Sequence, residues 1–388
     1  MTTVNKVIVT NKCSLQRKYG GNWTNIQAAI TELMNKDLTR GLSSELIFLD
    51  DHTVMSGLGG VAVLSDTSPQ QNLEAVKAVV TARNPTYVML LGSIDVIPHQ
   101  NLTNPIYGDG NLERDPDETA WSDLPYASRV PYSQNIGDFV TPTVSVGRLP
   151  DITHGTDANY LIGLLHIAKD YQCQPRSAYK HYMGLSKLDW QPFTELSLKA
   201  DFGNATAIKV IDGMVHSPWP TALLKNLSHF VNCEGLPFHP KYFASGVGFA
   251  NQVALDAEEL KNIILEGTVV AAECCYGAQL YNPALAGNKP SMGNVYLANK
   301  AYGYLGTSTV AYGGTTVHPR PVDDFAVLIC QFFMKHILAG ASLGGALLLT
   351  RQEYVGSKTP LSDTDLKTLA QFNLMGDPSL RPVCVSRS

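Results

Sequence analysis

Short apolar runs rich in β-branched residues alternate with amphipathic stretches in the first 90 residues. Three of these runs have the composition of buried strands: residues 6–10, 45–49 and 87–91. Between them, residues 23–35 and 70–83 place apolar side chains at helical spacing, and Pro85 stops the second helix. Strands that alternate with helices of this length form parallel sheets with crossover helices. The pattern therefore predicts an α/β fold.

The same alternation resumes after a polar stretch. Residues 100–143 are rich in Asn, Asp and Pro and predict a long excursion over the surface. We place a boundary near residue 150, between an N-terminal α/β subdomain (1–150) and a larger subdomain (151–388). The pattern predicts further strands at 143–150, 182–185, 207–210, 229–232, 268–272 and 307–312. It predicts further helices at 157–171 (capped by Thr156), 190–200, 255–265, 291–299 and 325–338.

Composition excludes several classes of protein. Hydrophobic residues make up 44% and charged residues 16%, which is typical of a folded chain. The 29 basic and 34 acidic residues give a net charge of -5, so we expect no nucleic-acid partner. The longest apolar run, 337–349, is shorter than the ~20 residues of a membrane span and predicts a buried helix. The first residues lack a signal-peptide pattern, so we expect a cytoplasmic protein with no membrane partner.

The seven cysteines form an odd set without a CxxC pair. This argues against a disulfide framework and against a structural zinc site. We therefore predict free thiols and no bound metal, and one thiol becomes a candidate for reactivity.

The strand at 268–272 leads directly into the most informative segment of the chain. It delivers Glu273, Cys274 and Cys275, and Gly277 then turns the chain. A thiol would thus lie at the carboxyl end of a sheet strand, where open α/β folds place their sites. This arrangement favours a nucleophile. A pair of buried structural cysteines is the alternative, because free Cys is among the most buried residue types.

A hydrophobic strand followed by an acidic residue, a small residue, Cys, any residue and Gly resembles the nucleophile block of the caspase, legumain and gingipain clan. Four other segments resemble gingipain-type (family C25) cysteine peptidases in the same order: 86–98, 122–127, 144–150 and 373–381. The resemblance spans most of the chain. It implies a caspase-like, mostly parallel sheet sandwiched by helices, with a smaller N-terminal α/β subdomain.

The resemblance also implies a function. A gingipain-like cysteine endopeptidase attacks peptide or protein substrates through a thioester intermediate, without a cofactor. A cytoplasmic peptidase needs restraint, so a regulatory protein partner is a further expectation.

Register identifies Cys275 rather than Cys274 as the nucleophile. With Cys275 as the nucleophile, Glu273 falls at the acidic position and Gly277 lies two residues after the thiol. Successive strand residues point to opposite faces of the sheet, so we expect Cys274 to pack inward. The resemblance implies that the backbone N–H groups of Gly235 and Cys275 hold the oxyanion. It also implies substrate-binding roles for three residues: Glu273, Thr315 and His318. A solvated loop is the alternative for His318.

The resemblance implies a His-Gly pair at the end of another strand, and here the matching pair is Glu234-Gly235. A carboxylate, with a reference pKa of about 4.3, cannot readily protonate a leaving amine and opposes a neighbouring thiolate. We therefore expect an inactive or impaired dyad. Three explanations stay open: an engineered change, a natural pseudopeptidase, or a site that recruits another histidine such as His239. The alternative function is a non-catalytic module that binds peptides or a protein partner.

Overall fold

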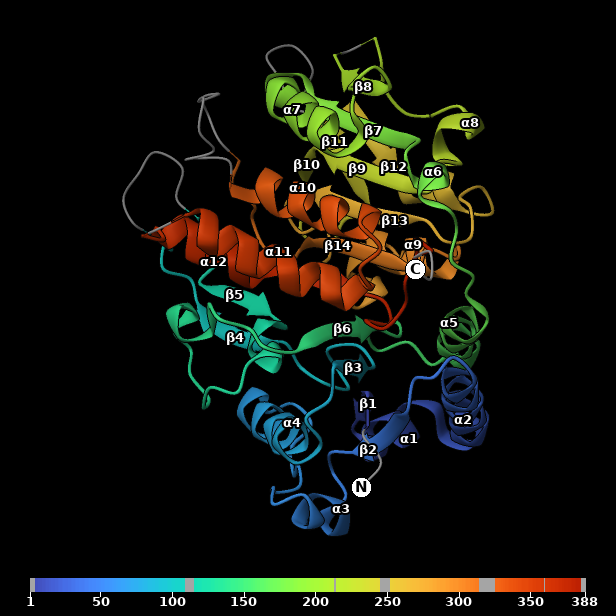
Figure 1. Ribbon diagram of the computed structural model, residues 1–388, viewed down its shortest axis with the longest axis vertical. Coiled ribbons are helices and arrows are strands. Elements are labelled where there is room, and N and C mark those ends of the chain that lie inside the picture. The colour runs from blue at the N-terminus through green and yellow to red at the C-terminus, as the bar shows by residue number, and fades with distance from the viewer. Residues whose placement is uncertain are drawn as a thin grey trace.

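The computed structural model describes residues 4–108, 115–212, 214–244, 252–313, 325–358 and 360–384. Within these residues, ten strands form one sheet that runs through the whole molecule (Figure 1). Their spatial order is β2 (Ser44–Phe48), β1 (Lys6–Thr10), β3 (Tyr87–Leu91), β6 (Ser145–Leu149), β15 (Phe372–Met375), β14 (Gly303–Thr307), β13 (Val269–Glu273), β9 (Ser228–Asn232), β7 (Tyr182–Lys187) and β8 (Ile208–Ile211). All neighbours pair in parallel except β14 and β15, which are antiparallel.

Strands from both sides of the predicted boundary near residue 150 belong to this one sheet. The C-terminal strand β15 lies between them and pairs with β6 through Met375 and Arg148. Two small antiparallel sheets flank the main one. They consist of β4 (Gln100–Thr103) with β5 (Thr119–Ser122), and of β10 (Glu234–Gly235), β11 (Lys241–Ala244) and β12 (Gln252–Asp256).

Helices cover both faces of the sheet. On β14, a side chain at Gly303 would meet Leu343 of α11 (Leu343–Ser357), whereas the next residue, Tyr304, contacts α9 (Met292–Ala298) near Gly293. Successive strand residues point to opposite faces, so α9 and α11 lie on opposite sides. The remaining helices are α1 (Lys12–Tyr19), α2 (Trp23–Thr39), α3 (His52–Gly57), α4 (Pro69–Arg83), α5 (Ala158–Asp170), α6 (Arg176–Tyr179), α7 (Gln191–Phe202), α8 (Thr221–Leu224), α10 (Phe325–Leu338) and α12 (Asp363–Gln371).

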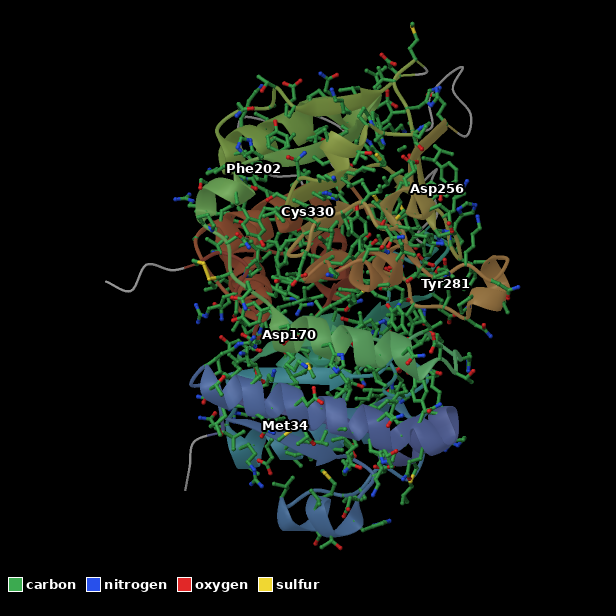
Figure 2. The ribbon with its side chains drawn as sticks, turned by 90° about the vertical axis from the view of Figure 1, so that its right-hand side faces the viewer. Met34, Asp170, Phe202, Asp256, Tyr281 and Cys330 are labelled. Atoms are coloured by element: carbon green, nitrogen blue, oxygen red, sulfur yellow. A yellow bond between two sulfur atoms is a disulfide. The ribbon has the colours of Figure 1, made fainter. Side chains whose placement is uncertain are left out.

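The predicted mixed fold with a mostly parallel sheet between helices is confirmed. Figure 2 shows the side chains that fill the layers, among them Cys330 of α10, which is fully buried against the sheet. In the described part of the chain, no helix has both the length and the apolar character needed to cross a membrane.

Four of the predicted elements are wrong in detail. Residues 255–265 do not form a helix, because β12 ends there at Asp256 and a short 3-10 turn follows. The strand predicted at 307–312 ends at Thr307. The apolar run 337–349 contains a turn at Gly340 and therefore belongs to two helices, α10 and α11. Helix α5 is capped by the carboxylate of Asp157, which lies one residue closer to the helix than Thr156.

The polar segment 100–143 is also more than a surface excursion. The β4–β5 hairpin packs against α12, and a small separate core forms there from Leu102, Ala120, Leu124, Ile136, Phe139 and Ala370. The few apolar residues in this segment are spaced too irregularly to predict that core.

A buried junction joins the segments that carry the family resemblance. The Arg148 guanidinium donates to both carboxylate oxygens of Asp123 at 2.8 and 2.6 Å, and to the carbonyls of Gly92 and Ile97. The Asp123 backbone N–H donates to Asn373 at 2.8 Å. Despite burial, Arg148 and the neighbouring His99 hold the pKa of the Asp123 carboxyl well below its usual range. This Asp123–Arg148 junction thus explains why four distant blocks of sequence occur together.

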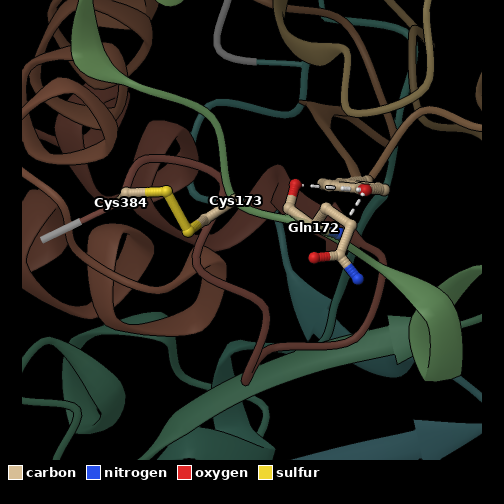
Figure 3. Close-up of a disulfide and its surroundings, with 4 residues drawn as sticks. Gln172, Cys173 and Cys384 are labelled. Carbon is tan, nitrogen blue, oxygen red and sulfur yellow. Dashed lines mark hydrogen bonds between the residues drawn. A yellow bond between two sulfur atoms is a disulfide. The ribbon is translucent and has the colours of Figure 1, made fainter.

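The prediction of free thiols is wrong for two of the seven cysteines. Cys173 and Cys384 form a disulfide (Figure 3), and backbone hydrogen bonds of Gln174 to Pro382 and Cys384 flank it. The sequence separation of 211 between the two cysteines explains the error, because only the tertiary fold brings them together. The other five cysteines are free: Cys13, Cys233, Cys274, Cys275 and Cys330.

Candidate active site

Three neighbouring parallel strands, β7, β9 and β13, end at the same edge of the main sheet. Their ends carry three chemically active side chains. Lys187 is the last residue of β7, Glu234 follows β9 by two residues, and Cys275 follows β13 by two residues. Because Asn232 and Glu273 are register partners, Glu234 and Cys275 follow adjacent strand ends, as the sequence predicts for a dyad.

The two adjacent cysteines have different surroundings. Cys274 is fully buried, and its sulfur faces the Val231 carbonyl at 3.9 Å. Burial raises the pKa of this thiol well above its ordinary value. Cys275 is partly exposed. The alternation of strand residues therefore places Cys275 in the position from which a thiol can react.

Gly235 packs directly against the backbone of Cys275. A side-chain carbon at this position would lie 1.8 Å from the Cys275 carbonyl oxygen, so no residue other than glycine fits. At this distance the Gly235 backbone N–H acts on the Cys275 thiol in the direction that favours the thiolate and lowers its pKa. The family resemblance implies an oxyanion hole, formed by the backbone N–H groups of Gly235 and Cys275, in this neighbourhood.

A second backbone group contacts the same sulfur. The Ala311 N–H donates to Cys275 Sγ at 3.3 Å. The pKa of the Cys275 thiol is raised to about 11, chiefly by burial and also by the Glu234 carboxylate. The N–H groups of Ala311 and Gly235 and the Lys367 ammonium lower it and only partly offset this rise. At pH 7 only about one thiol in ten thousand is ionised at such a pKa. A thiol with this pKa needs a proton acceptor before it can act as a nucleophile.

The residue at the predicted dyad position is bound to a lysine that the sequence analysis missed. Lys187 Nζ lies 3.0 Å from Glu234 Oε1, and the ammonium also lies 4.7 Å from the centre of the Trp190 ring. The lysine is 12% exposed and the glutamate 28%. The sequence does contain a signal for this pair, since Lys187 ends a strand at the same sheet edge as the thiol.

The other predicted site residues lie in different surroundings. Glu273 is buried at the end of β13, and its Oε1 lies 3.2 Å from where a side-chain carbon of Gly313 would be. Thr315 and His318 lie outside the described residues. The ring of His239 packs edge-on against Phe243 of β11, and burial lowers the pKa of its imidazole.

A partly exposed thiol at a parallel strand end, with the Ala311 N–H on its sulfur and Gly235 packed against its backbone, fits a cysteine hydrolase of the caspase-like class. The model of peptidase family C25 matches residues 241–383, which include Cys275 but neither Lys187 nor Glu234. A search of curated proteins finds no match.

Solved structures share the fold over nearly the whole chain. The Arg-specific cysteine proteinase gingipain R superposes with a TM-score of 0.63 at 11% identity, over 98% of this chain and 80% of that one. The complex of Porphyromonas gingivalis RgpB pro- and mature domains gives 0.60 at 12% identity, over 97% and 79%. A structure described as a protease gives 0.60 at 13%, over 98% and 79%.

The resemblance to gingipain-type (C25) cysteine peptidases is thus confirmed, by the family match over the C-terminal part and by the fold over nearly all of the chain. Together, the family match and the shared fold support a cysteine-type endopeptidase.

Proposed function

We propose that this chain binds peptide or protein segments at the Cys275 strand end and cleaves them slowly or not at all. The observation that carries the proposal is the ion pair of Lys187 and Glu234 beside the thiol. A cysteine peptidase needs a group that takes the thiol proton and returns it to the leaving amine. A carboxylate engaged in an ion pair is a poor substitute for the imidazole that performs this exchange in a Cys/His dyad.

The electrostatics around Cys275 support low turnover. Glu234 disfavours the thiolate, and the thiol pKa of about 11 leaves it protonated at neutral pH. Loss of a general acid costs about 10²- to 10⁴-fold in rate. The expected oxyanion hole, formed by the backbone N–H groups of Gly235 and Cys275, does not depend on this proton exchange and can still hold a substrate carbonyl.

Lys187 favours a natural origin of Glu234 over an engineered one. A lysine 3.0 Å from this side chain complements a carboxylate, but it would repel the imidazolium of a working dyad. The two positions therefore fit each other as they stand. A pseudopeptidase explains this complementarity better than a single changed residue. His239, whose ring packs against Phe243, is the weaker candidate for a substitute acid.

The cytoplasmic location and the regulatory partner stay predictions. A disulfide such as that of Cys173 and Cys384 is typical of proteins in oxidising compartments, so it argues against the cytoplasmic location. Fractionation of the source cells, with free thiols trapped beforehand, would show whether the protein lies in the cytoplasm or in an oxidising compartment.

Protection of the thiol tests the proposed function. The unaltered chain is incubated with a mixture of unstructured peptides, and alkylation of Cys275 by iodoacetamide is followed by peptide mass spectrometry, with Cys13 as an exposed internal reference. We expect peptides to slow alkylation of Cys275 but not of Cys13, while the peptides stay intact over hours. If peptides leave the alkylation rate of Cys275 unchanged, as they do that of Cys13, binding at this site is refuted. Rapid cleavage of the peptides would refute the proposal that catalysis is impaired.

A further inference from the structure

One carboxylate from the N-terminal half holds both segments that flank the Cys275 thiol. Tyr276, the residue after the thiol, donates its O–H to Asp117 Oδ1 at 3.0 Å. Val310, the residue before Ala311, donates its backbone N–H to Asp117 Oδ2 at 2.8 Å. Asp117 thus joins the turn that follows Cys275 to the segment whose N–H contacts the sulfur.

Both segments lie outside the regular strands and depend on such contacts for their positions. Tyr276 has a φ of 56°, which non-glycine residues seldom adopt and which surrounding structure must maintain. The Tyr276 backbone N–H donates to the Thr309 carbonyl at 3.0 Å. The segment that contains Val310 and Ala311 pairs with no strand among the described residues.

Asp117 is itself fixed by a buried cation. Lys367 of α12 is completely buried, and its ammonium lies 3.9 Å from Asp117 Oδ2 while it forms an ion pair with Asp115. The ammonium also lies 5.1 Å from the centre of the Tyr312 ring. A buried lysine needs such anions, so Lys367 sets the place of the Asp117 carboxylate.

We propose that Asp117 is a positioning residue for the Cys275 thiol, which keeps the Ala311 N–H on the sulfur by fixing Tyr276 and Val310. The inference rests on the proposed function only in taking Cys275 as the nucleophile. Asp117 acts through the two segments that it holds and takes no part in proton transfer.

When Asp117 is replaced, the direction in which the pKa of the Cys275 thiol changes distinguishes a positioning role of Asp117 from a direct effect of its charge. Glu234 of β10 and Lys367 of α12 face the thiol, and Asp115, Asp117, Tyr276 and Tyr312 surround Lys367. Removal of the Asp117 charge alone would favour the thiolate and lower the pKa. Loss of the Ala311 N–H contact would remove a stabilising hydrogen bond and raise it.

The experiment measures the pH dependence of Cys275 alkylation in the full chain between pH 7 and 11, again relative to Cys13. We expect Asp117→Ala to raise the apparent pKa of Cys275 by about half a unit or more, which slows alkylation about threefold at pH 9. Tyr276→Phe removes one of the two contacts and should give a smaller shift in the same direction. Glu118→Gln, a neighbouring exposed carboxylate, is the matched control and should leave the pKa unchanged.

An unchanged or lowered pKa in Asp117→Ala would overturn the proposal. Should that variant fail to fold, Tyr276→Phe decides, because it retains the whole aromatic ring, and an unchanged pKa in it would also overturn the proposal. Peptide protection of Cys275 is measured on the unaltered chain, so its failure would refute the proposed function without altering this result.

Discussion

Two carboxylate–cation pairs, Asp123 with Arg148 and Glu234 with Lys187, differ in burial and in what they do. In the first pair both side chains are at most 6% exposed, and the carboxylate receives two guanidinium N–H groups and a contact from His99. In the second pair a single contact of 3.0 Å joins side chains that are 12% and 28% exposed. The buried pair holds distant chain segments together, whereas the partly exposed pair sets the charge beside a nucleophile.

The family resemblance follows the same division. The segments 86–98, 122–127, 144–150 and 373–381 converge on the Asp123–Arg148 junction, which maintains the fold. The predicted departure from the family pattern lies at Glu234, where we propose that it alters proton transfer. On this proposal, the chain retains the fold of a peptidase while its chemistry changes.

Removal of one partner from each pair should give very different losses of stability. Asp123→Ala leaves a buried guanidinium unpaired, and we expect the free energy of unfolding to fall by about 3–5 kcal/mol. Glu234→Ala should cost less than about 1 kcal/mol, because water solvates the remaining lysine. Urea unfolding of both variants and the unaltered chain measures the difference, and equal losses would contradict the comparison.

The disulfide provides a third, covalent link between distant segments. We expect Cys173→Ala/Cys384→Ala to lower the free energy of unfolding by about 2–4 kcal/mol, since the bond restricts a long loop in the unfolded chain. A non-reducing peptide map first shows whether the bond forms. If the double variant unfolds at the same urea concentration as the unaltered chain, the link contributes nothing to the fold.

The Asp123–Arg148 junction also has a pH signature. The pKa of Asp123 is lower in the folded chain than in the unfolded one, so its contribution is complete above the unfolded pKa of about 3.9 and declines as pH falls through the folded value. The stability difference between the unaltered chain and Asp123→Asn should thus be constant from pH 5 to 8 and shrink below about pH 4. A difference that changes between pH 6 and 8 would point to another group.

The smallest effect is expected from Lys187→Met. Without the ammonium, the Glu234 charge acts on the thiol undiminished, so alkylation of Cys275 at pH 9 should slow by about two- to fivefold. Lys199→Met on α7, an exposed lysine paired with Glu195, is the control. Faster alkylation in Lys187→Met would show that the lysine does not shield the thiol from Glu234.

The sequence predicts the parts of this molecule that depend on local pattern. The β-branched runs at β1, β3 and β13 and the helical spacing of α4 and α10 need no tertiary information. The helix predicted at 255–265 is wrong because Leu255, Leu260, Ile263 and Ile264 recur at helical spacing, although β12 ends at Asp256 and a 3-10 turn follows. The sequence did not predict the disulfide, Lys187 or Asp117 for one reason: each joins residues that lie far apart along the chain, and a single sequence gives no distance between them.

Peptide cleavage by Lys187→Glu/Glu234→His tests the central claim most directly. The double variant supplies an imidazole beside Cys275 and replaces the repelling ammonium with a carboxylate that stabilises imidazolium, whereas Glu234→His alone keeps the ammonium and should gain less. We predict that kcat/KM of the double variant exceeds that of the unaltered chain by at least about 10²-fold on the same peptides, and that Cys275→Ala abolishes the gain. Equal kcat/KM in the double variant and the unaltered chain would contradict the claim that the Lys187–Glu234 pair limits turnover.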